Sequence, residues 1–321
     1  MPSSTRRDFL NTLPAAALSL LAARQAFPVA AKMRLAVFTD EITQDFGRAV
    51  EIAAREFGLR WVEVRNLWGK HLLELTAAEM GEAKRLLDRY QLQICSIANP
   101  LFKTDWPDAP ISRESPNKSG KIPADLMKSQ DQLLDRGIEV ALEFGKPPLR
   151  CFDFWRLENP ASHRAAMNQT LDKAAQKAGH RGITLMIENE PSCNTASSKE
   201  AAEVLASIPN PNFKLLWDPG NSWFAGLDPF PEGYRLLPIA RIAHVHCKDA
   251  VKNAAGKPEW AAIGRGKINF PGLFAALSRD GYSGALSLET HWHGAGSTEE
   301  STRQSMKGLK EALAKAQVAW E

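Results

Sequence analysis

The sequence predicts a single (β/α)8 TIM barrel, a fold of the α/β class, on three observations. Short apolar, β-branched runs alternate with longer segments of helical period, which is the pattern of repeated strand–helix units around a parallel sheet. Eight such units occur between residues 32 and 321, and we find no linker that would divide them into two domains. One closed barrel with insertions accommodates this number of units. We therefore assign residues 32–321 to one barrel domain.

The strands are expected where apolar runs are followed by helical or turn-forming segments. In chain order the eight predicted strands are Arg34–Thr39, Trp61–Arg65, Gln93–Ala98, Leu149–Phe154, Ile183–Glu188, Phe213–Asp218, Ile239–His246 and Ala285–Glu289.

Several helices between these strands are legible from capping signals and apolar periodicity. Thr76 and Glu79 stand at the spacing of a capping box, which predicts a helix start. Apolar residues then repeat on one face of three predicted helices: Met80, Ala83, Leu87 and Tyr90; Leu134, Ile138 and Ala141; and Met306, Leu309, Leu313, Ala316 and Trp320. An irregular stretch, 99–123, follows the third strand, and its length predicts a lid over the face where active sites lie in barrels.

Composition and charge disfavour several classes of function. The chain of 321 residues carries 40 Lys and Arg against 37 Asp and Glu, interspersed along its length. A nucleic-acid-binding domain normally shows a basic stripe instead, so we expect no nucleic acid as a partner. The four cysteines stand far apart, without the spacing of a zinc ribbon or a disulfide framework. No Gly-x-Gly-x-x-Gly follows the first strand, which disfavours a Rossmann dinucleotide site.

Residues 1–31 have the pattern of a twin-arginine signal peptide. Arg6 and Arg7 precede an apolar stretch, 13–23, that is too short to cross a bilayer comfortably but suits the apolar region of a signal. Small residues at 29–31 permit cleavage before Lys32. We therefore expect export to the periplasm, with no stable membrane anchor after cleavage. The alternative is an amphipathic or disordered N-terminus.

Polar residues at the ends of four predicted strands mark the candidate site, because the carboxyl ends of barrel strands converge around one pocket. They are Glu188, Asp218, His246 and Glu289, and each ends an apolar run in the second half of the chain. Three carboxylates and an imidazole in one cavity would repel without a cation. A donor set of mostly oxygen with one nitrogen favours Mn²⁺ first, then Mg²⁺, with Co²⁺ or Zn²⁺ as alternatives.

Three alternatives stay open at this point. A charged residue that ends a strand is commonly just solvated or a helix N-cap, so the joint pattern of four indicates the site more strongly than any one of them. His244 shares the strand of His246 with the same parity, so geometry alone does not choose between them. His291 and His293 follow Glu289 and are candidates for substitute ligands.

Five segments carry a resemblance to a known family: LMIENEP (185–191), LLWDPGNSW (215–223), IAHVHCKDA (242–250), IGRGKINFPGLFAAL (263–277) and GYSGALSLET (281–290). Over residues 33–318 the chain resembles the sugar phosphate isomerase/epimerase family of xylose isomerase-like barrels, which includes D-tagatose 3-epimerase, inosose dehydratase and hydroxypyruvate isomerase. The resemblance implies that Glu188, Asp218, His246 and Glu289 bind one divalent metal, and it favours His246 over His244.

The resemblance also implies a mechanism. In the epimerases of this family the two metal-binding glutamates form the acid/base pair, which gives these catalytic roles to Glu188 and Glu289. A metal that chelates a carbonyl oxygen and a neighbouring hydroxyl stabilises an enediolate, while a carboxylate beside it removes the α-proton. Return of the proton at another atom or face gives isomerisation or epimerisation. We therefore expect a metal-dependent sugar isomerase or epimerase with a small carbohydrate as substrate.

Departures from the epimerase pattern bear on the substrate-binding residues. Where the epimerases carry a substrate-binding His and Arg, this chain has Asn221 and Lys252, which argues against a free ketohexose. Lys248, in the family's Lys-Asp dipeptide, is expected to orient a substrate hydroxyl, and the alternative is a salt-bridged loop. Glu63 at the end of the second strand completes the candidates together with Trp223, because aromatic rings often stack on sugar faces.

Other functions compete with this interpretation. A lyase or dehydratase that acts on 3-keto-glycosides or inososes would use the same metal and the same proton abstraction. An endonuclease IV-like DNA repair enzyme needs a trinuclear zinc site built from several histidines. This chain has only seven His and no basic stripe, which disfavours that function. A non-catalytic sugar-binding protein is disfavoured because both acid/base glutamates are present. The sequence leaves a homo-oligomer open.

Overall fold

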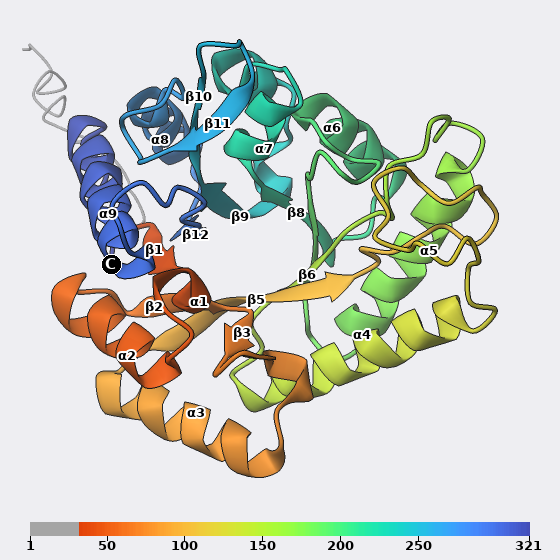
Figure 1. The fold of residues 1–321 in the computed structure, drawn as a ribbon, viewed down its shortest axis with the longest axis horizontal. Coiled ribbons are helices and arrows are strands. Elements are labelled where there is room, and N and C mark those ends of the chain that lie inside the picture. The colour runs from red at the N-terminus through yellow and green to blue at the C-terminus, as the bar shows by residue number, and fades with distance from the viewer. Residues whose placement is uncertain (1–31) are drawn as a thin grey trace, which may run out of the picture. The chain divides into compact units, whose positions relative to one another are not determined.

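The barrel predicted from the sequence is the observed fold. A computed structural model describes residues 32–321, and residues 1–31, which carry the predicted signal peptide, lie outside the described residues. Eight parallel strands surround a central axis and helices cover them on the outside (Figure 1). The strands are β1 (Arg34–Val37), β2 (Trp61–Val64), β5 (Gln93–Leu101), β6 (Leu149–Cys151), β7 (Leu185–Glu188), β8 (Phe213–Trp217), β9 (Ile242–Cys247) and β12 (Ala285–Leu288).

The strand order is β1-β12-β9-β8-β7-β6-β5-β2, which leaves one seam between β1 and β2. A single parallel bridge between Phe38 and Glu63 joins these two strands. Register shifts interrupt the β2–β5, β5–β6 and β8–β9 ladders, whereas the β12–β9 ladder is regular, with His246 opposite Ser287 and Val245 opposite Leu286. The barrel is therefore nearly closed, and all eight carboxyl ends lie at one end of it.

The helices follow the strands as the periodicity predicts. They are α1 (Thr39–Ile42), α2 (Phe46–Glu51), α3 (Ala77–Tyr90), α4 (Leu126–Glu143), α5 (Arg164–Gly179), α6 (Ser198–Ser207), α7 (Pro219–Phe224), α8 (Phe270–Arg279) and α9 (Thr298–Lys315). The capping box at the start of α3 is confirmed, since Thr76 and Glu79 exchange side-chain and backbone hydrogen bonds. The prediction that Trp320 belongs to the last helix was wrong, because α9 ends at Lys315. Trp320 lies beyond it and forms a parallel β-bridge with Met33.

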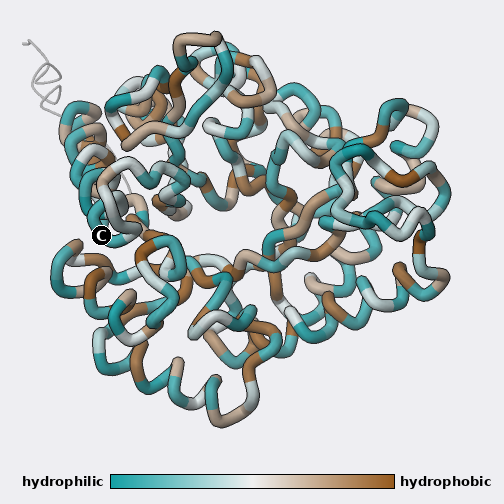
Figure 2. Tube along the Cα trace, in the orientation of Figure 1, coloured by the Kyte–Doolittle hydropathy of each residue, from teal (hydrophilic) through white to brown (hydrophobic). Residues whose placement is uncertain are grey.

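The alternation of side chains along each strand divides the core into two parts. Outward side chains such as Val245 and Leu286 belong to the large apolar cluster between strands and helices. Figure 2 shows hydrophobic residues along the strands and hydrophilic ones on outer turns of the helices. Inside the barrel the floor is formed by a small separate cluster of Ala36, Cys95 and Ala285, with Trp61 packed against it. Polar side chains fill the barrel above that floor.

Two hairpins and one long loop are added at the carboxyl ends of the strands. The hairpins are β3 (Asn66–Leu67) with β4 (Lys70–His71), and β10 (Asp249–Lys252) with β11 (Pro258–Ala261). The predicted lid begins slightly later than expected, because β5 continues to Leu101. The four cysteines are free and buried. Among helices of the described chain, none combines the length and apolarity that a membrane span requires.

Candidate metal and active site

Four neighbouring strands deliver the four predicted ligands to one point. Glu188 is the last residue of β7, Asp218 follows β8, His246 lies near the end of β9 and Glu289 follows β12. Since the strands lie side by side in the order β12-β9-β8-β7, their ends bring these residues together. All four are buried.

The ligand atoms of these residues form one compact group, in which all lie within 4.8 Å of one another. His246 Nδ1 is at the centre: it lies 3.1 Å from Glu188 Oε1, 3.3 Å from Glu289 Oε2 and 3.5 Å from Asp218 Oδ2. We call Glu188, Asp218, His246 and Glu289 the carboxylate–histidine cluster. The structure thus brings together the residues that the strand-end argument selected.

Lysine and arginine side chains compensate the negative charge of the cluster. Lys248 Nζ lies 2.7 Å from Asp218 Oδ2 and 2.7 Å from Glu289 Oε2. Arg150 Nη1 donates to Glu188 Oε2 at 2.9 Å, and other guanidinium nitrogens of Arg150 donate to backbone carbonyl oxygens of the β5 strand. Lys248 and Arg150 are themselves buried away from water, so the carboxylates in turn compensate the positive charge of each.

The pKa values in the cluster reflect this charge balance. Burial raises the pKa of Glu188, but Arg150 and then His246 outweigh burial and lower it to about 2. Burial likewise opposes ionisation of Glu289, yet Lys248 above all holds its pKa well below the usual range. For His246, burial disfavours the charged ring while Glu63, Glu188 and Glu289 raise its pKa well above the ordinary value. Binding of a cation at Nδ1 therefore has to release a proton.

Besides the number and type of ligands, unsatisfied carboxylate oxygens indicate that the cluster suits a divalent cation. Asp218 Oδ2 and Glu289 Oε2 are buried and, within residues 32–321, accept no hydrogen bond of acceptable geometry, although the Lys248 ammonium is close to both. Buried carboxylate oxygens are normally satisfied, so these two are available to a ligand. Three carboxylates with one imidazole suit Mg²⁺, Mn²⁺ or Zn²⁺. The preference for Mn²⁺ stays a prediction.

Asp218 is fixed by its place at the start of a helix. Its Oδ1 accepts the backbone N–H of Asn221 at 2.8 Å, which makes it the N-cap of α7. Asn189 holds its backbone from both sides, accepting the Asp218 N–H at 2.7 Å and donating to the Asp218 carbonyl at 2.8 Å. One carboxylate oxygen therefore caps the helix while the other, Oδ2, points at the cluster. The N-cap alternative and the ligand assignment are compatible at this residue.

Comparison with known proteins identifies the family. A model of the family described as xylose isomerase-like TIM barrel matches residues 52–312. The chain belongs to this family. A relative, the rhizopine catabolism protein MocC of Rhizobium meliloti, is 28% identical over 138 residues. That match spans 39% of this chain and 42% of the length of MocC.

Solved structures confirm the xylose isomerase-like fold at low sequence identity. The IOLI protein with a bound zinc atom has a TM-score of 0.67 at 13% identity, covering 88% of this chain and 98% of that one. The probable 3-DHS dehydratase AsbF of Bacillus anthracis has a TM-score of 0.64 at 18% identity, with coverage of 87% and 98%. The D-allulose 3-epimerase of Methylomonas sp., in complex with D-allulose, has a TM-score of 0.63 at 18% identity, with coverage of 89% and 98%.

Of the predicted substrate-binding residues, some contact the carboxylate–histidine cluster and others lie away from it. Asn221 is buried against the cluster and donates to Glu188 Oε1 at 3.3 Å. Lys248 reaches the cluster directly, as described above. Trp223 is half-buried on α7 and packs against the apolar core. Lys252 is exposed on the β10–β11 hairpin and makes no hydrogen bond or ion pair with the cluster in the part of the chain that the structure describes.

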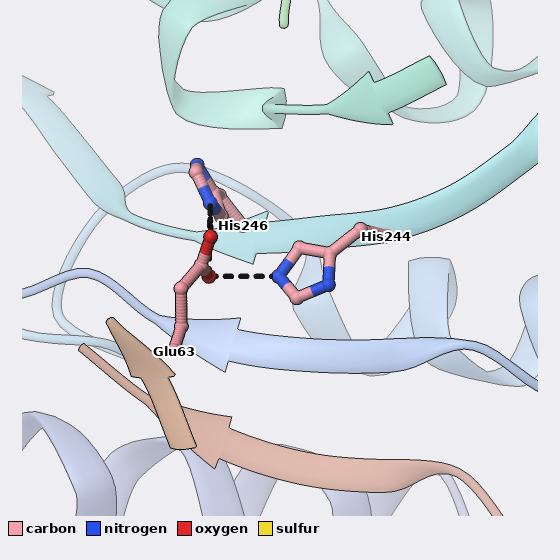
Figure 3. Close-up of side chains that lie close together, drawn as sticks. All are labelled: Glu63, His244 and His246. Atoms are coloured by element: carbon pink, nitrogen blue, oxygen red, sulfur yellow. Dashed lines mark hydrogen bonds and ion pairs between the residues drawn. The ribbon is translucent and has the colours of Figure 1, made fainter. Parts of the chain in front are cut away.

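Glu63 lies inside the barrel and contacts histidines. Its carboxylate is fully buried, with Oε2 2.8 Å from His244 Nε2 and 3.2 Å from His246 Nε2 (Figure 3). The two histidines differ in their surroundings: His246 reaches the carboxylate–histidine cluster through Nδ1, whereas His244 meets Glu63. Of the substitute ligands, His291 contacts Glu289 Oε1 at 3.2 Å and His293 is exposed.

Two residues of the site were missed by sequence reasoning. Arg150 carried a signal, because a single arginine within an otherwise apolar strand of a barrel must point inward or find a buried partner. Trp260, on β11, carried none. Its ring stacks on Phe224 with centroids 3.9 Å apart, meets His291 edge-on at 5.1 Å, and lies 5.3 Å from Lys248 Nζ. The β10–β11 hairpin therefore brings an aromatic side chain beside the cluster.

Proposed function

We propose that this protein is a divalent-metal-dependent sugar isomerase or epimerase that works by proton abstraction next to a carbonyl. One observation carries the proposal: three carboxylates and an imidazole from four strand ends lie within 4.8 Å of one another, and among residues 32–321 two of the buried carboxylate oxygens accept no hydrogen bond of acceptable geometry. When bound there, a divalent cation supplies charge stabilisation at the carbonyl oxygen of a substrate.

The two glutamates are suited to the proton transfers. Both are ionised at neutral pH for the reasons given above, so either can accept a proton. Glu188 comes from β7 and Glu289 from β12, with β8 and β9 between them in the barrel wall, so the carboxylates approach the cluster from different directions. The ionised carboxylate of one glutamate takes the proton from carbon, and the same carboxyl group can return it at a neighbouring atom, which is isomerisation. Return on the opposite face, which is epimerisation, requires that the other glutamate has already taken up a proton.

The groups around the glutamates hold them for this task. Arg150 and Asn221 fix the two oxygens of Glu188, and Lys248 and His291 do so for Glu289. Lys248 also offers an ammonium group beside Glu289 that can bind a substrate oxygen. Family membership and the fold shared with a D-allulose 3-epimerase support a carbohydrate as the substrate.

Elimination by the same residues is the second candidate. AsbF, which has the same fold, is named a probable dehydratase, and the substrate decides whether an abstracted proton is returned or a β leaving group departs. A metal-dependent lyase on 3-keto-glycosides or inososes would therefore need no further catalytic group. A non-catalytic sugar-binding protein is the alternative from another class.

Deuterium exchange tests the proposal. The metal-loaded protein is incubated in D₂O with free sugars, 3-keto sugars, inososes and glycosides, and the loss of C–H signals is followed by proton NMR. We expect exchange that EDTA abolishes and that the double variant Glu188→Gln, Glu289→Gln lacks. Product signals separate epimerase from lyase. Full turnover by the double variant would contradict the acid/base assignment, and sugar binding without exchange would favour the binding protein.

We further propose that the protein acts after export through the twin-arginine pathway. Arg6, Arg7 and the apolar stretch that follows support this. Sequencing of the N-terminus from the periplasmic fraction should find Lys32 or a nearby residue first, and replacement of both arginines by lysine should retain the protein in the cytoplasm. An unprocessed cytoplasmic protein would contradict the proposal.

A further inference from the structure

Glu63 connects three strands of the barrel through one buried carboxylate. It lies on β2 and faces His244 and His246 of β9 across the interior (Figure 3). Ser96 of β5 donates its hydroxyl to Glu63 Oε1 at 2.8 Å. His244 Nε2 lies 2.8 Å from Oε2, and His246 Nε2 lies 3.3 Å from Oε1 and 3.2 Å from Oε2. Each oxygen therefore has partners at hydrogen-bonding distance.

We propose that Glu63 is a positioning residue that fixes the tautomer and the ring orientation of His246. This inference rests on the proposed function, because it concerns how His246 serves as a metal ligand. Glu63 would hold the proton of the imidazole on Nε2, so that the lone pair of Nδ1 points into the carboxylate–histidine cluster. This role differs from the substrate binding that was expected for Glu63 from the sequence.

The hydrogen-bond inventory of the two side chains gives the reason. An ionised carboxylate only accepts hydrogen bonds, and a neutral imidazole carries one proton on either of its nitrogens. If that proton were on Nδ1, the lone pair of Nε2 would face the Glu63 oxygens in a site that water does not reach. With the proton on Nε2, the contact with Glu63 is a charge-assisted hydrogen bond and Nδ1 is free to bind a cation.

His244 and Ser96 position Glu63 itself. The 2.8 Å contact from His244 and the 2.8 Å bond from Ser96 hold the carboxylate from two sides, which leaves the edge between the two oxygens facing His246. The rings of His244 and His246 lie at 90° to one another with centroids 5.4 Å apart, so both can present Nε2 to the same carboxylate. Two histidines of equal parity on β9 thus contact one carboxylate.

Glu63, His244 and His246 could by spacing form a metal site of their own, since their ligand atoms also lie within 4.8 Å of one another. The hydrogen bonds decide against that use. Both Glu63 oxygens have hydrogen-bonded partners, whereas Asp218 Oδ2 and Glu289 Oε2, near Nδ1 of His246, accept no hydrogen bond of acceptable geometry within the described residues and have only the Lys248 ammonium close by. A cation is therefore expected at Nδ1 of His246, and Nε2 is committed to Glu63.

The test compares the full-length wild type with Glu63→Gln, which keeps the size of the side chain but adds an amide donor. That donor can satisfy Nε2 without its proton and so permits the wrong tautomer. Calorimetric titration with Mn²⁺ should show affinity about 10–100-fold lower in Glu63→Gln. The matched control is Asp153→Asn, which also neutralises a fully buried carboxylate, one held by Arg164 and Thr195, and should leave the Mn²⁺ affinity within about twofold of the wild type.

Nitrogen NMR of the ¹⁵N-histidine-labelled, Zn²⁺-loaded protein supplies the readout that a merely structural role would not move. In the wild type we expect His246 with Nδ1 coordinated and a downfield Nε2–H proton, and in Glu63→Gln the loss or upfield movement of that proton. Mn²⁺ affinity of Glu63→Gln equal to the wild type, or a wild-type His246 bound through Nε2, would overturn the proposal. If Glu63→Gln does not fold, the wild-type spectrum still decides it. Failure of the wild type to bind any metal would instead refute the proposed function.

Discussion

Lys248 Nζ lies 2.7 Å from Glu289 Oε2, an oxygen that a metal ion would also use. The same ammonium lies 2.7 Å from Asp218 Oδ2. Burial lowers the pKa of a lysine, but here Asp218 and Glu289 raise the pKa of Lys248 above its ordinary value. The lysine thus places a positive charge at the carboxylate–histidine cluster, where it would repel a bound metal ion unless its side chain moved away.

Replacement of Lys248 by methionine should therefore tighten metal binding while it destabilises the metal-free protein. Two unit charges 4 Å apart interact by about 4 kcal/mol at the dielectric typical of such sites, so a gain of about tenfold or more in Mn²⁺ affinity is expected. Without metal, loss of the ammonium leaves buried carboxylates uncompensated, at a cost of about 3–5 kcal/mol in the free energy of unfolding.

Calorimetric titration and urea denaturation in EDTA measure the two effects. Lys310→Met is the control, because Lys310 bonds the Phe57 carbonyl on the outside of the barrel and contacts no cluster residue among those described. Metal binding by Lys248→Met that is unchanged or weaker would show that the ammonium does not compete with the cation.

Metal removal should lower the stability of the whole barrel. A ligand at 100 times its dissociation constant stabilises the folded state by about 2.7 kcal/mol, so Mg²⁺, Mn²⁺ or Zn²⁺ should raise the melting temperature and EDTA should lower it. In Asp218→Asn this shift should disappear, because a charged ligand is lost while asparagine still caps α7.

Asp228→Asn is the matched control for Asp218→Asn. Asp228 also caps a helical turn, where it accepts the Phe230 N–H at 2.9 Å, but it is exposed. Differential scanning fluorimetry with and without metal should show a full metal-dependent shift in Asp228→Asn. A shift of equal size in Asp218→Asn would remove Asp218 from the ligand set.

Asp153, a buried carboxylate outside the carboxylate–histidine cluster, should affect the stability of the fold but not the proposed activity. Asp153 accepts the Thr195 backbone N–H at 2.9 Å and its hydroxyl at 2.6 Å, and it pairs with Arg164 at 2.6 Å. Asp153→Asn weakens these charge-assisted bonds, so the free energy of unfolding should fall by about 1–3 kcal/mol in urea denaturation. Deuterium exchange by the folded variant should persist. Loss of exchange at full stability would place Asp153 in the active site instead.

The architecture could be predicted from the sequence because it depends on local periodicity. Each of the eight strands overlaps the apolar run that predicted it, and the strand-end argument needed only the fact that parallel strands of a barrel end together. For that reason Glu188, Asp218 and Glu289 were found without any knowledge of side-chain packing. The order of the strands around the barrel then follows from the order of the units in the chain.

What could not be predicted depends on contacts across the barrel. Glu63 meets His244 although 181 residues separate them, and neither the parity of β2 nor that of β9 says which side chains touch. The choice between His244 and His246 needed the same information. Trp260 reaches Lys248 and His291 only because of the course of the β10–β11 hairpin, whose conformation has no periodic signal.

The acid stability of the protein should depend on Glu200, which lies outside the carboxylate–histidine cluster. Its Oε2 accepts the backbone N–H groups of Ala196 and Ser197 at 2.8 and 3.0 Å, and its Oε1 accepts a bond from Arg156 at 2.8 Å. Burial raises the pKa of Glu200, but Arg156 and then the Ala196 N–H outweigh burial, so the pKa lies below its ordinary value of 4.5. The unfolded chain therefore binds a proton more readily than the folded one.

It follows that Glu200 stabilises the fold fully above its unfolded pKa, and that this stabilisation is lost as the pH falls from 4.5 through the folded value. Urea denaturation of the wild type and Glu200→Gln between pH 7 and pH 3 should give a difference in the free energy of unfolding that is constant near neutrality and shrinks as the pH falls below 4.5. Glu203→Gln on the same helix, at a more exposed position, should follow the wild type throughout. A constant difference between wild type and Glu200→Gln over the whole range would mean that Glu200 acts through its shape and not through its charge.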